Sequence, residues 1–165
     1  VFAEYSIVQA DASVFFGNSA AYRAGAIDAI RSKVYLSHCT LAGNSAPTGG
    51  ALGVGSNTTA RLTSSILWGN TAATSSPAIY ILGGAGADCS MSYSDVDVSQ
   101  DSIACTAGSG MLAADPRFVD PASDWALQSD SPCIDAGTST TAYYDLLGVP
   151  RGAKPDMGAY EYVAP

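Results

Sequence analysis

The chain has 165 residues, enough for one domain or for a repeat body with a terminal unit. Its net charge is −8 and it has no basic patch, so we expect no nucleic-acid partner and no binding to anionic lipid. No apolar run reaches the ~18 residues of a membrane-spanning helix, which argues against direct membrane insertion. The charged share of 13% and the 17 Gly residues favour short strands and turns over helices.

A four-residue motif recurs along the first half of the chain. It occupies residues 17–20, 43–46 and 69–72, with the sequences GNSA, GNSA and GNTA, so the period is 26 residues. A fixed period of 20–50 residues indicates a solenoid or a repeat array. Each copy contains an asparagine, preceded three positions earlier by a large apolar residue. The asparagines are Asn18, Asn44 and Asn70, and the apolar residues are Phe15, Leu41 and Leu67.

The segments between these motifs alternate apolar and polar residues, as in 33–37 and 60–63. Such alternation predicts strands with one buried face, and Gly, Asn, Ser and Pro fall between them as turns. We therefore predict an all-β fold, a right-handed parallel β-helix of about three to four coils with a non-repetitive C-terminal cap. In this fold the repeated positions form columns. The asparagines then form an internal hydrogen-bonded ladder, and the apolar residues form a core stack. A ligand-facing asparagine row is the alternative.

The organisation follows from where the repeat holds. Residues 1–82 form the repeat body, residues 83–110 an irregular coil with loops, and residues 111–165 a cap over the last coil. The charge changes at the end of the repeats. Residues 1–82 carry four basic and three acidic side chains, whereas residues 83–165 carry three basic and twelve acidic ones. Because the chain starts inside a partial coil, we expect self-association or a longer parent β-helix.

The four cysteines fit no zinc-binding spacing. Cys89 and Cys105 flank a segment rich in Gly, Ser and Asp, which favours a loop closed by a disulfide. Four buried free thiols are the alternative. The acidic, Ser- and Thr-rich composition is typical of an exported protein.

Two family resemblances rest on quoted motifs. Residues 15–18 (FFGN) and 49–52 (GGAL), with weaker copies in the other coils, resemble the repeats of polymorphic membrane proteins, which are autotransporter adhesins. Four C-terminal motifs, in order, resemble the choice-of-anchor Q region of exported bacterial β-helix proteins. They are 115–120 (DPRFVD), 131–137 (SPCIDAG), 144–151 (YDLLGVPR) and 155–162 (PDMGAYEY). These resemblances imply the β-helix fold and export to the cell surface. They imply no agreed activity.

Catalytic chemistry finds little support in the sequence. A polysaccharide lyase needs a base, and Arg31 and Lys33 belong to the one basic cluster, in a predicted turn with no acid column beside it. Asp11 and Asp28 sit at different coil offsets, which does not suit the paired carboxylates of a glycoside hydrolase. His38 precedes Cys39, but nothing completes a triad or a metal shell around them.

Acidic loops offer one cofactor alternative. Asp95, Asp97 and Asp101 form one cluster, and Asp115, Asp120 and Asp124 form another. Ca²⁺ prefers such oxygen-rich loops, but Asp is also an ordinary turn residue, so we expect no cofactor and keep Ca²⁺ as the alternative. Tyr35 and Trp68 sit beside inward positions, so strand alternation points both outward as candidate surface contacts.

The sequence therefore favours a non-catalytic β-helix module at the bacterial cell surface, with a structural, adhesive or self-assembling role. The partners we expect are carbohydrate or another surface protein, besides copies of the chain itself. The alternative is a carbohydrate-active β-helix enzyme or its carbohydrate-binding module.

Overall fold

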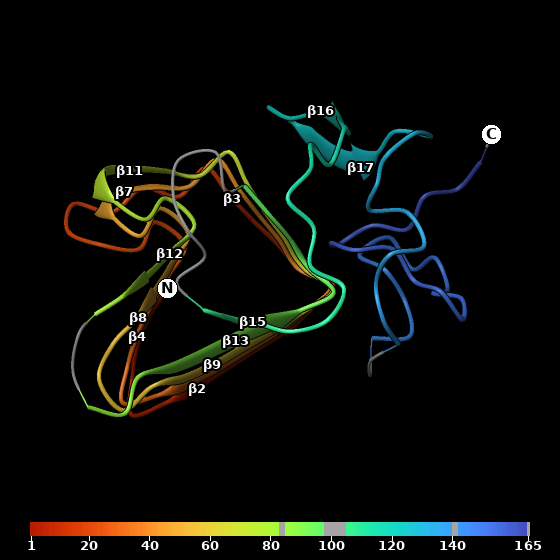
Figure 1. The fold of residues 1–165 in the computed structure, drawn as a ribbon. Helices are drawn as coiled ribbons and strands as arrows, with labels where there is room; N and C mark the ends of the chain where they lie inside the picture. Colours follow the sequence, from red (N-terminus) through yellow and green to blue (C-terminus); the bar gives the residue numbers. More distant parts are fainter. Residues whose placement is uncertain (83–84, 98–104, 140–141, 165) are drawn as a thin grey trace.

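The computed structural model describes residues 1–82, 85–97, 105–139 and 142–164. Across these residues the secondary structure is all-β, and parallel strands from successive coils stack into a β-solenoid of about four turns, which confirms the predicted fold class. Viewed along its axis, the solenoid has a roughly triangular cross-section (Figure 1). Within the described ranges, no helix has the length and apolar character that crossing a membrane requires.

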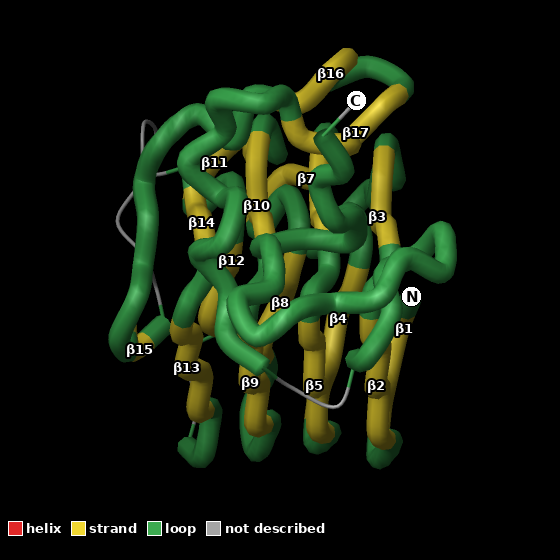
Figure 2. The backbone as a smooth tube through the Cα atoms, turned by 90° about the vertical axis from the view of Figure 1, so that its right-hand side faces the viewer, coloured by secondary structure: helices red, strands yellow, loops and turns green. Residues whose placement is uncertain are grey.

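Three sheets form the sides of the solenoid, and we name two of them. The open wall has the order β15-β13-β9-β5-β2, and the covered wall has the order β14-β10-β6-β3. The open wall contains β2 (Ile7–Asp11), β5 (Lys33–Ser37), β9 (Thr59–Thr63), β13 (Asp88–Ser92) and β15 (Thr106–Ala107). The covered wall contains β3 (Val14–Phe16), β6 (Thr40–Ala42), β10 (Ile66–Trp68) and β14 (Asp95–Val96). Figure 2 shows β2, β5, β9 and β13 of the open wall side by side in coil order.

The remaining strands complete each turn. The third side consists of β1 (Phe2–Glu4), β4 (Ile27–Ile30), β8 (Leu52–Val54) and β12 (Ile79–Ile81). A short two-stranded sheet joins β7 (Ser45–Thr48) to β11 (Thr71–Ser75), and a C-terminal hairpin pairs β16 (Phe118–Asp120) antiparallel with β17 (Asp124–Leu127).

The strand registers follow the 26-residue period. Val8 pairs with Val34 and Val34 with Ala60 on the open wall. Phe15 pairs with Leu41 and Leu41 with Leu67 on the covered wall. Leu41 and Leu67 are fully buried in the solenoid core, whereas Phe15, in the first coil, is partly buried against it. Period-2 alternation explains the arrangement, because every second side chain of a strand points into the solenoid.

The three motif asparagines lie in one column at a turn. Asn18 Nδ2 donates to Asn44 Oδ1 at 2.9 Å, and Asn44 Nδ2 donates to Asn70 Oδ1 at 3.0 Å. Asn44 Nδ2 also donates to the carbonyl of Phe15, while Asn44 Oδ1 accepts from the backbone N–H of Asn18. Asn44 is fully buried, so this column is internal and satisfies backbone groups that water does not reach.

The solenoid continues beyond residue 82. Strands β13 and β14 supply a fourth coil, in which Asp95 pairs with Ile66, a spacing of 29 residues. Cys89 and Cys105 form a disulfide, which confirms the predicted pair. It ties β13 to the segment that leads into β15, so the last turn is closed covalently. Cys39 and Cys133 are buried free thiols.

Most of the described part of the C-terminal segment, residues 111–165, lies beside the solenoid, whereas its first residues continue onto the last coil, where Leu112 bridges to Asp95. Figure 1 shows the lateral part outside the cross-section, next to the corner between the open and covered walls. Its ring contact with the first coil joins Phe16 to Trp125, whose centroids are 4.3 Å apart. Its hydrogen bonds reach the second and third coils, since Ala159 N donates to Thr40 Oγ1 and Gly158 N donates to the Ser64 carbonyl. The segment predicted to cover the last coil therefore touches that coil through Met111 and Leu112 and lies for the most part along the covered wall.

This lateral position creates a second hydrophobic core. The outward side chain of Ile66, on the covered wall, is fully buried with residues of the C-terminal segment. The buried partners are Phe118, Leu127, Cys133 and Met157. The segment lacks a repeat, but it has an apolar face, and the outer side of the covered wall is apolar as well. Burying both stabilises the pair.

Candidate functional site

The two named walls differ in what their outer faces contact. On the covered wall, the outward side chains of Thr40 and Ile66 are fully buried under the C-terminal segment. On the open wall, strand β5 keeps an alternating pattern in which Lys33 is exposed, Val34 is buried and Tyr35 is 37% exposed. The open wall is therefore a face on which outward side chains remain accessible to a ligand.

The two aromatic residues expected at the surface lie on different walls. Tyr35 belongs to the open wall, whereas Trp68 ends β10 on the covered wall and packs against the second core. Trp68 also lines an open hollow of about 480 Å³ together with Arg117 and Gln128 of the C-terminal segment. The pair does not form one contact surface, because the sequence pattern gives the direction of a side chain but not what covers it.

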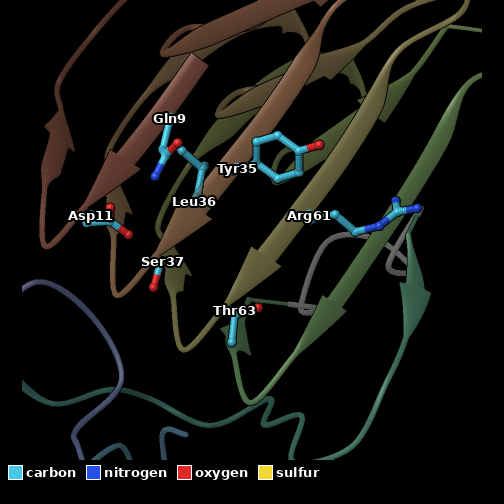
Figure 3. A pocket seen from close by; sticks show the side chains of 7 residues that line it. All are labelled: Gln9, Asp11, Tyr35, Leu36, Ser37, Arg61 and Thr63. Carbon is cyan, nitrogen blue, oxygen red and sulfur yellow. The ribbon is translucent and has the colours of Figure 1, made fainter. Parts of the chain in front are cut away.

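A hollow of about 320 Å³ surrounds Tyr35 on the open wall. Figure 3 shows Gln9, Tyr35 and Arg61 in one row across β2, β5 and β9. Asp11 and its register partners Ser37 and Thr63 form a second row. Leu36 lies between these rows along β5, but its side chain points into the solenoid core, so the floor of the hollow at this position is strand backbone. Three neighbouring coils thus build one site.

The hollow has one cation and one acid in its lining. Arg61 pairs with Asp88 of the next coil, and its Nη1 donates to the carbonyl of Ala60 at 2.9 Å. Arg61 is the register neighbour of Tyr35, and its guanidinium extends along the wall toward Asp88 of the next coil. Asp11 supplies a carboxylate on the other side of the hollow.

This combination suits a carbohydrate more than a compact apolar ligand. A tyrosine ring offers an apolar face with a polar tip, on which the C–H side of a sugar ring can lie. Carboxylate, amide, hydroxyl and guanidinium groups supply acceptors and donors for sugar hydroxyls. The hollow lies on the outer face of the wall, where Tyr35 is exposed, so an extended chain can reach it.

His38 and Cys39 face opposite sides of the solenoid corner. His38 is fully buried under the C-terminal segment, and its Nδ1 donates to the Asp156 carbonyl at 3.0 Å. Burial lowers the pKa of His38 to about 4, helped by the charge of Arg151. Cys39 is buried in the solenoid core, and burial raises the pKa of its thiol to about 11. The His38 imidazole thus helps to hold the C-terminal segment against the solenoid and does not activate the Cys39 thiol.

The acidic loops form turns in the C-terminal segment. Asp115 Oδ1 accepts from Arg117 N, Asp120 Oδ1 from Ala122 N and Asp124 Oδ1 from Ala126 N, at 2.9, 2.9 and 3.0 Å. These contacts are Asx turns. Among the described residues no group of three His, Cys, Asp or Glu side chains is placed to hold a metal ion. Asp101, from the first predicted cluster, lies outside the described residues.

Asp95 is an acid of the covered wall that the sequence did not distinguish from a loop residue. It is fully buried, and its oxygens accept hydrogen bonds from Ala114 N and Cys133 Sγ at 3.1 and 3.3 Å. Burial raises the pKa of Asp95 to about 6. The carboxyl joins the fourth coil to the C-terminal segment, so its role is in docking.

Comparison of the chain with models of protein families, with curated proteins and with solved structures finds no match.

Proposed function

We propose that this chain is a non-catalytic β-helix module of an exported bacterial protein, which adheres to carbohydrate through its open wall. The observation that carries the proposal is the Tyr35 hollow, where an accessible aromatic ring lies among polar side chains from three coils. Extended polymers suit such a wall, because its stacked strands place outward side chains from neighbouring coils side by side on one continuous face.

The covalent structure supports a role outside the cytoplasm. The Cys89–Cys105 disulfide is of the kind that persists in oxidising compartments. The motifs that resemble the choice-of-anchor Q region supply docking residues here, such as Phe118 and Cys133 in the second core and Asp156 at His38. This supports reading the segment as a unit of such exported proteins. Self-association or continuation into a longer β-helix stays a prediction.

Binding to a panel of immobilised polysaccharides tests the proposal. We expect the wild-type chain to bind at least one of them, and Tyr35→Ala to weaken that binding about tenfold or more, the effect of losing roughly 1.4 kcal/mol. Tyr22→Ala is the matched control, because Tyr22 is 88% exposed and lies outside the hollow. Its affinity should equal that of the wild type.

Two outcomes would contradict the proposal. One is the absence of binding to every polysaccharide, or binding that Tyr35→Ala leaves unchanged. The other is turnover of a bound polysaccharide that is lost on changing Arg31 or Lys33, which would establish the alternative of a carbohydrate-active enzyme. Product analysis by mass spectrometry of each binding mixture distinguishes adhesion from cleavage.

A further inference from the structure

A second hollow lies on the same wall, at the start of its strands. It has a volume of about 330 Å³, and its lining includes Tyr5, Arg31, Lys33 and Asn57. Lys33 begins strand β5, two residues before Tyr35, so the two hollows are about 7 Å apart along the strand. They are close enough for one extended ligand to occupy both.

The corner beside this hollow presents a column of side chains from successive coils. Tyr5, Arg31 and Asn57 all have positive φ, between 51° and 53°, at equivalent positions of three coils. The Arg31 guanidinium lies 5.3 Å from the centre of the Tyr5 ring, and its Nη1 is 3.1 Å from Glu4 Oε1. These contacts hold the guanidinium at the edge of the hollow, while part of its donor fork is not used by Glu4.

Lys33 adds a second cation. It stands in the outward row of the open wall between Ile7 and Thr59, neither of which carries a charge. Among the described residues, no carboxylate lies within ion-pair distance of its ammonium. The hollow therefore has two cations in its lining, Arg31 and Lys33, and one acid next to it, Glu4, which pairs with Arg31.

The acidic part of the molecule lies at the other end of the strands. Residues 111–165 carry eight of the fifteen acids and three cations, and the described part of this segment docks next to the corner where the open-wall strands end (Figure 1). Near the strand starts, Glu4 and Asp88 are each paired with an arginine. An anionic ligand on the open wall is thus attracted at the strand starts and repelled toward the strand ends. The charge distribution gives such a ligand one preferred position.

We propose that the Arg31–Lys33 hollow binds the carboxylate of an acidic polysaccharide, a uronic-acid chain whose neighbouring sugar lies in the Tyr35 hollow. The fork of Arg31 matches the plane of a carboxylate, and Lys33 contributes a point charge beside it. This inference rests on the proposed carbohydrate-binding role of the open wall and adds the chemical class of the ligand.

The test uses glucuronate oligomers and the same oligomers with their carboxyl groups reduced to alcohols. The wild-type chain should bind the acidic oligomers about tenfold more tightly than the reduced ones, and added salt should narrow the difference. Lys33→Gln should weaken binding of the acidic oligomers about tenfold and leave binding of the reduced ones unchanged. Lys154→Gln is the matched control, because Lys154 is an exposed lysine of the C-terminal segment.

The outcomes separate this inference from the proposed function. If Tyr35→Ala weakens binding of both oligomers whereas Lys33→Gln changes neither, carbohydrate binding stands and the acidic ligand class is overturned. If neither oligomer nor any other polysaccharide binds, both proposals fail. Because Lys33 is exposed, Lys33→Gln should unfold at the wild-type denaturant concentration. If this variant keeps its stability and loses affinity only for the acidic oligomers, the result supports the carboxylate site.

Discussion

The solenoid and the C-terminal segment bury adjacent residues of the same strand in opposite directions. Leu67 points into the solenoid core, whereas its neighbour Ile66 points outward into the second core, and both are fully buried. No described segment covers the open wall in this way at β5, which keeps its alternation of exposed and buried residues. The outer face of the covered wall therefore stabilises the fold by packing against the C-terminal segment. The open wall is the side available to a ligand.

The largest effects should come from emptying the two cores separately. Leu67→Ala and Ile66→Ala each remove a fully buried aliphatic side chain, which costs roughly 2–5 kcal/mol. We expect Leu67→Ala to lower the stability of the whole solenoid. Ile66→Ala should mainly loosen the C-terminal segment, because its contacts lie between that segment and the wall.

Hydrogen exchange with mass spectrometry distinguishes the two variants. Faster exchange confined to residues 115–139 and 142–164 in Ile66→Ala, with an unchanged open wall, is the expected result. Equal acceleration over both regions in both variants would show that solenoid and C-terminal segment unfold as one unit, and the comparison above would then fail.

Asn44→Ala tests the ladder that fixes coil register. The change removes the acceptor of Asn18 N and the donor to the Phe15 carbonyl, and it leaves both groups unpaired at a partly buried turn. We expect a loss of about 3 kcal/mol in the free energy of unfolding by denaturant. Asn18→Ala should cost less, because Asn18 is exposed. Equal losses of unfolding free energy in the two variants would argue against burial as the source of the stabilisation. Carbohydrate binding should persist in both variants.

The disulfide should stabilise the last turn of the solenoid. Cys89 and Cys105 are 16 residues apart, a loop whose closure contributes about 3 kcal/mol in the chain-entropy account. Replacing both cysteines by serine should lower the denaturation midpoint by a corresponding amount, as should reduction of the wild type. If the double variant unfolds at the wild-type midpoint, the fourth coil is held by its strand pairing alone.

The docking of the C-terminal segment should have two opposing pH dependences. Asp95 has a folded pKa of about 6 against an ordinary 3.8, so its stabilisation is present at low pH and is lost as pH rises from about 4 to 6. His38 has a folded pKa of about 4 against 6.5, so its stabilisation is present above pH 6.5 and is lost as pH falls toward 4. Each group contributes on the order of 2–3 kcal/mol to the unfolding free energy, and in the wild type the two contributions largely cancel.

Single variants should reveal each dependence. Asp95→Asn should give a protein whose unfolding free energy rises with pH between 4 and 6.5. His38→Gln should give one whose unfolding free energy falls over this range, and the raised pKa values of Asp156 and Glu161 act in the same direction. Denaturant unfolding at several pH values measures both, and profiles parallel to the wild type would contradict these assignments.

Much of the solenoid could be predicted because it repeats. The 26-residue period places Asn18, Asn44 and Asn70 in one column, and alternation directs Leu41 and Leu67 inward. The lateral position of residues 111–165 could not be predicted in this way, since no period relates that segment to the strands it covers. The roles of His38 and Asp95 were missed for the same reason, because both act through contacts with residues distant in sequence. The sequence offered one signal of this docking: β10 is short and apolar at every position, as expected of a strand that is buried on both faces.

The central claim is that ligand binds the open wall and not the covered one. Titrating the ¹⁵N-labelled chain with glucuronate oligomers, and following amide chemical shifts by NMR, tests it most directly. The account predicts that the largest shifts fall in residues 5–11, 31–37 and 59–63, which line the two hollows. Shifts concentrated in residues 64–70 and 115–128, with the open wall unchanged, would place binding at the Trp68 hollow and contradict it.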